Sequence, residues 1–293
     1  MTRVSQGDCV PAQTTANVSA ATRRSLNKGE AASRTLVELL VIDFAQLMQH
    51  AACVPDAALM QLRAAQGDVR DDAAVHAMQE TLTRAGVKAP NAWKPGTKLG
   101  ITQRMALAGG LLAEHDAKAL DALAAHASDT VRGWAAYAAM RGAAAPRTLN
   151  GKLTAIKPFA ADEHSGVREW AWMAVRPAIE AEPQRAIELL TAWTASRDTN
   201  VRRFASEATR PRGVWCSHIA MLRKDPSAGL PLLEPLRADA ARYVQNSVAN
   251  WLNDASKDVP AFVRGVAKRW QQESPCAETA YIIRRAMRTL RVK

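Results

Sequence analysis

Four stretches of similar sequence decide the fold of this chain. They read DTVRGWA at residues 129–135, SGVREWA at 165–171, TNVRRFA at 199–205 and RYVQNSV at 242–248. Each has a valine in its third position, and the valines at 131, 167, 201 and 244 are separated by 36, 34 and 43 residues. A looser fifth copy begins near Tyr281. Internal repeats with periods of roughly 20 to 50 residues are typical of solenoids and related arrays.

The residues between these stretches favour helix. Ala, Leu, Arg and Met are strong helix formers, aromatic residues make up only 5% of the chain, and no segment shows sustained Val/Ile/Thr alternation. Two helices per repeat indicate an all-α fold, a right-handed α-solenoid of HEAT-like helical repeats, in which each helix pair buries its apolar side against the next. We expect residues 31–293 to form one solenoid domain and residues 1–30 to be a flexible N-terminal tail.

The charge of the chain indicates a polyanionic partner. It carries 39 Lys and Arg against 28 Asp and Glu, a net charge of +11, and residues 151–293 alone hold 23 basic and 15 acidic residues. Most of the basic residues are Arg, whose planar fork binds phosphate through two hydrogen bonds. A basic, Ala-rich and Arg-rich composition can equally reflect the composition of a genome, so charge by itself leaves both interpretations open.

Several classes of function find no support in the sequence. No apolar run approaches the roughly 20 residues of a membrane span, and the chain does not begin with an apolar signal segment. The four cysteines form no C-x-x-C pair, the six histidines have no metal-ligand spacing, and no Gly-rich phosphate loop occurs. We therefore expect no metal, no cofactor and no membrane partner, and a location in the cytoplasm.

Two carboxylates lie on the polar sides of the repeated helices. In the third copy, Arg203, Glu207 and Arg210 share the face opposite the apolar residues. In the fourth copy, Asp254 follows a stripe of asparagines, with no basic residue one turn before it. An ordinary interpretation exists for each, a helix-surface salt bridge for Glu207 and a C-terminal turn or cap for Asp254. The alternative is that both act on a substrate.

The tryptophans divide into two groups. Trp172 lies off the apolar face of the second copy, so it faces either a binding groove or the core. The same two positions are open to Trp251. Tryptophan at helical spacing in an Ala-rich solenoid is usually a core filler. The tryptophans that we assign to the core are Trp170, Trp193, Trp215 and Trp270.

Two longer runs carry a resemblance to a known family. The runs VRRFASEATRPRGVWC at residues 201–216 and YVQNSVANWLNDASKDVP at 243–260 resemble the bacterial DNA alkylation repair proteins of the AlkC and AlkD group, in particular AlkC. The close resemblance covers about residues 160–262. It implies a monomeric, monofunctional DNA glycosylase on a HEAT-like-repeat fold, which excises cationic N-alkylated bases such as 3-methyladenine from duplex DNA without base flipping. It also implies association with the nucleoid when the protein is on DNA.

The resemblance further implies roles for particular residues. Glu207 and Asp254 match acidic positions that the family places at the lesion's sugar, and we expect both to be catalytic. We expect Trp172 and Trp251 to contact the lesion. One departure is that the family pattern has a further Glu just before the Arg-Pro of the earlier repeat, where this chain has Trp172 and Met173. The residues expected to bind DNA are Arg168, Arg176, Arg202, Arg203, Arg210, Arg212, Arg242, Asn246 and Asn250.

The implied chemistry agrees with elementary physical arguments. Alkylation at N3 or N7 leaves the base positively charged, so the leaving group needs no general acid. A carboxylate can stabilise the oxocarbenium-like sugar and orient the attacking water. A tryptophan face can hold a cationic base by about 0.5 to 2 kcal/mol. Because the third acid is missing, the alternative remains a non-catalytic HEAT-repeat protein that binds damaged or distorted DNA.

Overall fold

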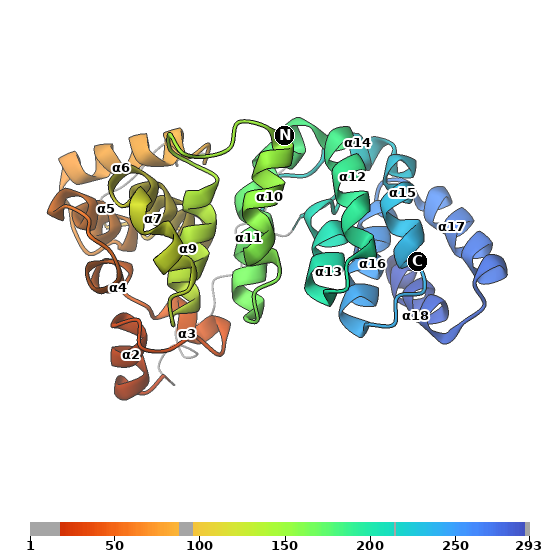
Figure 1. Cartoon of the computed structure of the whole chain (residues 1–293), viewed down its shortest axis with the longest axis horizontal. Helices are drawn as coiled ribbons and strands as arrows, with labels where there is room; N and C mark the ends of the chain where they lie inside the picture. The colour runs from red at the N-terminus through yellow and green to blue at the C-terminus, as the bar shows by residue number, and fades with distance from the viewer. Residues whose placement is uncertain (1–17, 88–95, 214, 291–293) are drawn as a thin grey trace. The chain divides into compact units, whose positions relative to one another are not determined.

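A computed structural model of the chain describes residues 18–87, 96–213 and 215–290. The chain divides into two compact units, unit 1 within residues 1–145 and 164–174, and unit 2 within residues 146–163 and 175–293. The described residues of both units form helices joined by turns, and none of them forms a strand. The predicted all-α class is therefore confirmed (Figure 1).

Unit 1 is built by helices that pack against helices near them in sequence. Contacts join α4 to α5, α5 to α6, α6 to α7 and α7 to α9. The unit also contains the first ten residues of α11, up to Ala174. Its helices are α2 (Ala20–Asn27), α3 (Leu36–Leu40), α4 (Phe44–Ala51), α5 (Asp56–Gln66), α6 (Asp72–Arg84), α7 (Ile101–His115), α8 (Leu120–Ala124), α9 (Asp129–Ala139) and the start of α11 (Ser165–Ala181).

The expected N-terminal tail is partly helical. Residues 1–17 lie outside the described part of the chain, but α2 begins at Ala20, where Ser19 caps it by accepting a hydrogen bond from the backbone N–H of Thr22. Leu26 is 1% exposed and anchors the helix in unit 1, where α2 contacts α4. One buried leucine in a polar segment has no recognisable periodicity, which is why the sequence favoured a tail for residues 20–30.

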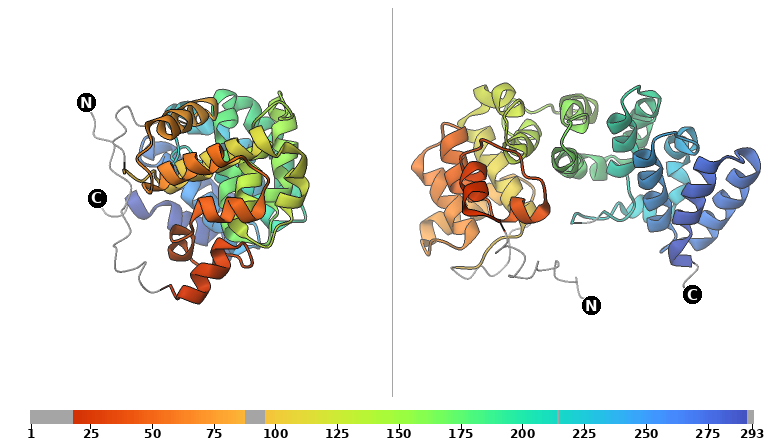
Figure 2. Two further views of the ribbon diagram at one scale, coloured as in Figure 1. Left: turned by 90° about the vertical axis from the view of Figure 1, so that its left-hand side faces the viewer. Right: turned by 90° about the horizontal axis from the view of Figure 1, so that it is seen from below.

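Unit 2 stacks the helices of the later repeats. Helix α16 packs against α13 on one side and α18 on the other, and α17 contacts both α16 and α18 (Figure 2). Its helices are α10 (Leu149–Ala160), the remainder of α11, α12 (Pro183–Thr191), α13 (Thr199–Ala208), α14 (Ala220–Lys224), α15 (Leu230–Leu233), α16 (Arg242–Ala255), α17 (Pro260–Glu273) and α18 (Ala277–Ala286).

The four repeated stretches coincide with the starts of four helices, α9, α11, α13 and α16. Their valines, at 131, 167, 201 and 244, are each no more than 2% exposed, as expected of the residue that anchors a repeat. Helix α13 is capped by Asp198, which accepts hydrogen bonds from the backbone N–H groups of Asn200 and Val201. Among the described residues, no helix combines the length and apolar character that crossing a membrane requires.

Candidate active site and nucleic-acid interface

The two acids singled out in the sequence meet on one guanidinium group. Arg210, just after α13, donates from Nη1 to Glu207 Oε1 at 2.7 Å. The same side chain reaches α16, where its Nε lies 2.8 Å and its Nη2 lies 2.7 Å from Asp254 Oδ2. We call Arg203, Glu207, Arg210, Ser247 and Asp254 the acid–arginine cluster. The structure thus brings both predicted catalytic residues together, within unit 2.

Small side chains let α13 and α16 approach closely enough for this contact. Ser206 donates a hydrogen bond to Ser247 Oγ at 2.8 Å, and Ser247 in turn donates to Glu207 Oε2 at 2.8 Å. Both serines are buried, being 0% and 2% exposed. The i, i+3 spacing of Glu207 and Arg210 places both on the side of α13 that faces α16. The polar face of α13 is therefore an interface between helices rather than a solvated surface.

Neighbouring charges keep Glu207 ionised despite its burial. Glu207 is 4% exposed and Asp254 is 2% exposed. Burial works to raise the pKa of Glu207, but the charges of Arg203 and Arg210, together with hydrogen bonds, outweigh it and hold the pKa below its usual value. A carboxylate in this setting carries its negative charge throughout the neutral range.

Asp254 differs from its sequence-based description. The asparagine stripe suggested a setting of amides, but Asp254 accepts from Arg210 and, through Oδ1, from Lys257 Nζ at 3.1 Å. Arg210 belongs to the neighbouring repeat, so local sequence could not reveal this pair. Lys257 is the exposed member of the arrangement, with 41% of its side chain accessible, and it covers the otherwise buried carboxylate.

A tryptophan that we assigned to the core is exposed instead. Trp215 is 53% exposed and has a φ of 65°. A bulky residue rarely adopts this left-handed conformation, and it persists only where the surroundings hold it. The segment that carries Trp215, residues 211–219, begins directly after Arg210. The prediction of a core position is therefore wrong, because Trp215 lies in a turn and not at helical spacing.

The segment around Trp215 is anchored by a buried arginine. Arg176 is 1% exposed and donates to the carbonyl oxygens of Ala208 at 2.7 Å, Arg210 at 2.7 Å and Ser217 at 3.2 Å. These bonds fix both ends of the turn that presents Trp215. They also correct the predicted DNA contact of Arg176, since its donors face carbonyl groups inside unit 2.

The two tryptophans expected at the lesion are buried. Trp251 is 0% exposed, and its Nε1 donates to the carbonyl of Thr209 at 3.0 Å. Trp172, which belongs to unit 1, is 3% exposed and donates from Nε1 to Glu169 Oε2 at 2.8 Å. Their indole rings fill space between helices, so the structure corrects the predicted contact of both with a base. Trp251 even takes the place of a side chain at Gly229, where a Cβ would lie 2.4 Å from its ring.

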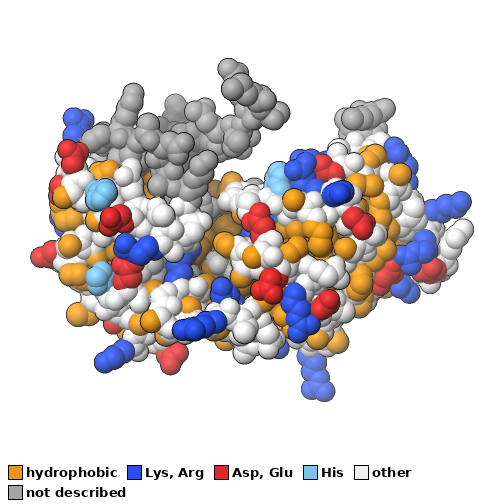
Figure 3. Space-filling model, turned by 90° about the horizontal axis from the view of Figure 1, so that it is seen from above, with side chains coloured by type: hydrophobic (Ala, Val, Ile, Leu, Met, Phe, Trp, Pro, Cys, Tyr) orange, Lys and Arg blue, Asp and Glu red, His pale blue; other side chains and the backbone are white. Residues whose placement is uncertain are grey.

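Most of the arginines expected on DNA are paired with carboxylates. Arg202 donates from Nε to Asp239 Oδ2 at 2.6 Å, and Arg212 donates from Nη2 to Asp258 Oδ1 at 2.6 Å. Arg203 lies over the ring of Tyr243, 4.5 Å from its centroid, and 3.4 Å from Glu207. On the face drawn in Figure 3, basic and acidic side chains are interspersed rather than gathered in one stripe.

The remaining predicted DNA contacts fall into two places. Arg168 lies half-buried on the part of α11 that belongs to unit 1. Arg242, Asn246 and Asn250 lie along α16 and face α18, where Asn246 accepts a hydrogen bond from the hydroxyl of Tyr281 at 2.8 Å. Asn250 accepts one from Arg288 Nη2 at 3.0 Å. These α16 residues are the part of the predicted surface that remains open to a partner.

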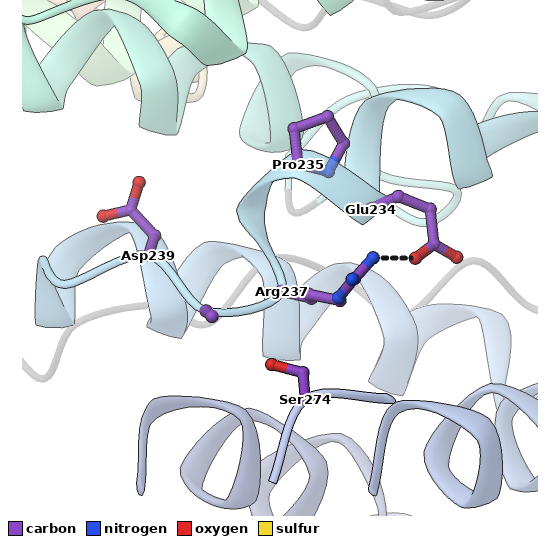
Figure 4. Close-up of a pocket in the computed structure, with 6 residues that line it drawn as sticks. Glu234, Pro235, Arg237, Asp239 and Ser274 are labelled. Carbon is purple, nitrogen blue, oxygen red and sulfur yellow. Dashed lines mark hydrogen bonds and ion pairs between the residues drawn. The ribbon is translucent and has the colours of Figure 1, made fainter. Parts of the chain in front are cut away.

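A hollow of about 520 Å³ in unit 2 offers a different candidate site (Figure 4). It is lined by Glu234, Arg237 and Asp239 together with Pro235, Ala238 and Ser274. Its carboxylates are already used: Glu234 accepts from Arg237 at 3.0 Å, and Asp239 pairs with Arg202. The hollow therefore offers little unsatisfied charge to a ligand.

Comparisons with known proteins place the fold. No protein-family model matches the chain. Over 117 residues it is 45% identical to an uncharacterized protein, YhaZ of Bacillus subtilis (strain 168), a match that spans 40% of this chain and 32% of YhaZ. The solved structure of Pseudomonas fluorescens alkylpurine DNA glycosylase AlkC, bound to DNA containing an abasic site analog, aligns with a TM-score of 0.54 and 26% identity. That alignment covers 80% of this chain and 61% of the AlkC chain.

A further solved structure, smu.31 from Streptococcus mutans UA159, aligns with a TM-score of 0.44 and 20% identity over 72% of this chain and 92% of that chain. The chain therefore spans about a third of YhaZ and less than two thirds of the AlkC chain. The similarity to AlkC confirms the predicted α-solenoid class: this chain has an AlkC-like helical fold.

Proposed function

We propose that the chain is a monofunctional DNA glycosylase that releases cationic N-alkylated bases, of the 3-methyladenine type, from duplex DNA without base flipping. The similarity to AlkC, a DNA glycosylase solved on DNA, supports a role in DNA alkylation repair. The observation that carries the enzymatic part is the meeting of Glu207 and Asp254 on Arg210, directly before the segment that presents Trp215.

The ionisation of the cluster fits this chemistry. An acid that protonates a leaving group needs a raised pKa, whereas the pKa of Glu207 is lowered. A base that is already cationic needs no such acid. It needs negative charge near the sugar, where an oxocarbenium-like centre develops as the N-glycosidic bond breaks. Asp254 would supply that charge and orient the water that attacks the anomeric carbon, and Glu207 would hold Arg210 and Asp254 in place.

Access to Asp254 runs past Lys257. Arg210 occupies Oδ2 of Asp254, and Lys257 covers Oδ1. Because the side chain of Lys257 is 41% exposed and flexible, it can swing into solvent when a cationic sugar approaches. The Asp254 carboxylate then exchanges the ammonium group of Lys257 for the cationic sugar. In the absence of DNA, Arg210 and Lys257 balance its charge.

Trp215 would hold the damaged base. Its indole is exposed, and the turn that carries it is tied to unit 2 by Arg176. A cation over an indole face gains about 0.5 to 2 kcal/mol, whereas a neutral base does not gain this term. Trp215 therefore replaces the buried Trp172 and Trp251 as the proposed lesion-contacting aromatic residue.

Base release tests the proposal. Duplexes that contain 3-methyladenine, 3-methylcytosine or 7-methylguanine are incubated with excess protein, and the free base is quantified. We expect release of 3-methyladenine well above the spontaneous rate, and loss of that release in the double variant Glu207→Gln, Asp254→Asn. Asp239→Asn is the matched control, because it removes a buried, arginine-paired carboxylate from the opposite end of the α13–α16 interface. Tight binding without release by the wild-type protein would contradict the proposal.

A second candidate function is non-catalytic binding of damaged or distorted DNA. The specific observation in its favour is that Trp172, at the position of a further glutamate in the resembled family, is buried in unit 1 and hydrogen-bonded to Glu169. Under this alternative, the acid–arginine cluster only fastens α13 to α16. The double variant would then lose stability and would show the same base release as the wild type, namely none.

A further inference from the structure

One group of arginines in unit 2 has a different environment from the rest. Arg242 of α16 lies over the ring of Tyr281, with its guanidinium carbon 3.6 Å from the ring centroid. Arg284 and Arg285 of α18 lie 5.3 and 5.6 Å from the same centroid. With Arg288, which follows on the next turn, they form what we call the α18 arginine cluster. All four arginine side chains are exposed.

The α18 arginine cluster has no carboxylate of its own. Arg288 donates to the carbonyl of Arg285 at 2.9 Å and to Asn250 at 3.0 Å. Within the described ranges, no ion pair joins any of the four arginines to Asp or Glu, although Arg202, Arg210 and Arg212 each have one. Like charges gathered without a counterion repel one another, so the arrangement favours an anionic partner from outside.

Tyr281 organises the arginines. Its hydroxyl donates to Asn246 Oδ1 at 2.8 Å, which fixes the ring between α16 and α18. When a guanidinium stacks on an aromatic ring, its plane lies parallel to the ring. Its N–H donors then point sideways, away from the ring, and stay available to a partner. The ring thus holds Arg242, Arg284 and Arg285 in place without using their hydrogen-bond donors.

The α18 arginine cluster lies close to the acid–arginine cluster. Burial and the charge of Arg285 lower the pKa of Arg288. Arg288 also donates to Asn250, which lies one helical turn before Asp254 on α16, so the two clusters are neighbours within unit 2. A polyanion held at α18 would therefore pass the carboxylates to which we assign the chemistry.

We propose that the α18 arginine cluster binds consecutive phosphates of duplex DNA. The proposal rests on the proposed function and adds to it the surface that holds the DNA backbone. The planar arginine fork matches a phosphate with two parallel hydrogen bonds, and such contacts position a protein on DNA without reading its sequence. The amide oxygens of Asn246 and Asn250, on the adjacent helix, accept hydrogen bonds from Tyr281 and Arg288 and so hold both side chains in place.

The test measures salt-dependent binding of the full chain to an undamaged duplex. The cluster variant is Arg284→Gln with Arg285→Gln. Each phosphate contact contributes roughly 0.9 to the slope of log affinity against log salt, so the variant should lose about 1.8 from the slope and bind about 60-fold more weakly at about 0.1 M salt. The matched control is Arg264→Gln with Lys268→Gln, which removes the same charge from exposed positions on the adjacent helix α17. The control should keep the slope of the wild type.

Two further variants keep the result interpretable. Arg284→Lys with Arg285→Lys retains the charge and should retain most of the slope. If the double Gln variant unfolds at a lower temperature than the control, Arg284→Gln alone should lose about 0.9 of the slope. Equal slopes in the cluster variant and the α17 control would overturn the proposal.

A membrane surface is the competing anionic partner, and vesicles of phosphatidylglycerol test it. If the cluster variant loses vesicle binding but keeps duplex binding, the surface is not a DNA site and the proposal is wrong. The undamaged duplex separates this inference from the proposed function. If the proposed function is wrong, the wild-type protein releases no base, but the cluster variant still shows the smaller salt slope. If the inference is wrong, the cluster variant keeps the salt slope of the wild type.

Discussion

Two ion-pair arrangements in unit 2 use the same residue types in opposite proportions. In the acid–arginine cluster, the guanidinium of Arg210 is shared by Glu207 and Asp254. A second arrangement, which we call the Asp258 clamp, reverses this: the carboxylate of Asp258 is gripped by two arginines. Arg212 donates to its two oxygens at 2.8 and 2.6 Å, and Arg223 donates to them at 3.0 and 2.9 Å.

This difference suggests a structural role for the Asp258 clamp and a catalytic role for the acid–arginine cluster. Hydrogen bonds from Arg223 and Arg212 hold the pKa of Asp258 well below its usual value, and both of its oxygens are saturated by arginine. The clamp ties the segment after α13 to the turn that follows α16. In the acid–arginine cluster, Arg210 is shared by two acids, and one oxygen of Asp254 meets only the exposed Lys257. We therefore expect loss of the clamp to affect stability and loss of the cluster to affect base release.

The largest effect is expected for Asp254→Asn. The amide keeps the size of the side chain but removes the charge that faces the sugar, so base release should fall by about a hundredfold or more. Stability should also fall, by about 1 to 3 kcal/mol, because Arg210 and Lys257 lose a charged acceptor. Single-turnover release and urea unfolding measure the two effects. Release at the wild-type rate would remove Asp254 from the mechanism.

Glu207→Gln should have the next largest effect. Glu207 is buried and acts through Arg210 rather than on the sugar itself, so release should fall by about 10- to 100-fold. Arg203 and Arg210 would then face an uncharged partner, and the slower release should persist at temperatures well below the unfolding transition. A variant that unfolds earlier but releases base normally when folded would identify Glu207 as purely structural.

Asp258→Asn probes the clamp and its dependence on pH. The folded-state pKa of Asp258 is depressed, so its stabilisation is fully present above the unfolded-state pKa of about 3.9 and is lost as the pH falls toward the folded value. At neutral pH the variant should be about 2 kcal/mol less stable than the wild type. The difference in unfolding free energy between the wild type and the variant should become smaller below about pH 4. Melting temperatures measured against pH check this; a gap that widens in acid would contradict the argument.

The smallest effect is expected for Trp215→Ala. Loss of a cation–π contact of about 0.5 to 2 kcal/mol should lower the preference for a cationic over a neutral damaged base by about 2- to 30-fold. Stability should change little, because Trp215 is 53% exposed. Trp251→Ala is the contrasting variant: its ring is fully buried, so it should lose about 3 to 5 kcal/mol of stability. Unchanged selectivity in Trp215→Ala would remove the aromatic contact from the proposal.

The repeats allowed the fold class to be predicted from the sequence. Each of the four repeated stretches has a buried valine in its third position, and these stretches placed the starts of α9, α11, α13 and α16 correctly. The contact between Glu207 and Arg210 was also within reach, since it lies inside one helix turn. The pairing of Arg210 with Asp254 was not, because it joins residues 44 positions apart on neighbouring helices.

Charge and aromatic residues were harder to place. Arg212 is neutralised by Asp258, 46 positions away, so a surplus of arginine in sequence overstated the surface available to DNA. Helical spacing likewise could not distinguish the turn of Trp215 from a core position, since φ depends on how Arg176 anchors the segment. The exposed arginines of α18 were passed over because their meaning depends on Tyr281, which stacks with Arg242 of the preceding repeat.

The most direct test of the account compares Asp254→Asn with Asp258→Asn in one experiment. Both variants remove one arginine-paired carboxylate: Asp254 lies in the last turn of α16, and Asp258 lies four residues later in the turn that follows the helix. For each, single-turnover release of 3-methyladenine is measured beside the melting temperature. We predict that Asp254→Asn loses about a hundredfold or more of the rate, while Asp258→Asn stays within about twofold of the wild type despite its lower melting temperature. Rates that fall together with melting temperature in both variants would contradict the assignment.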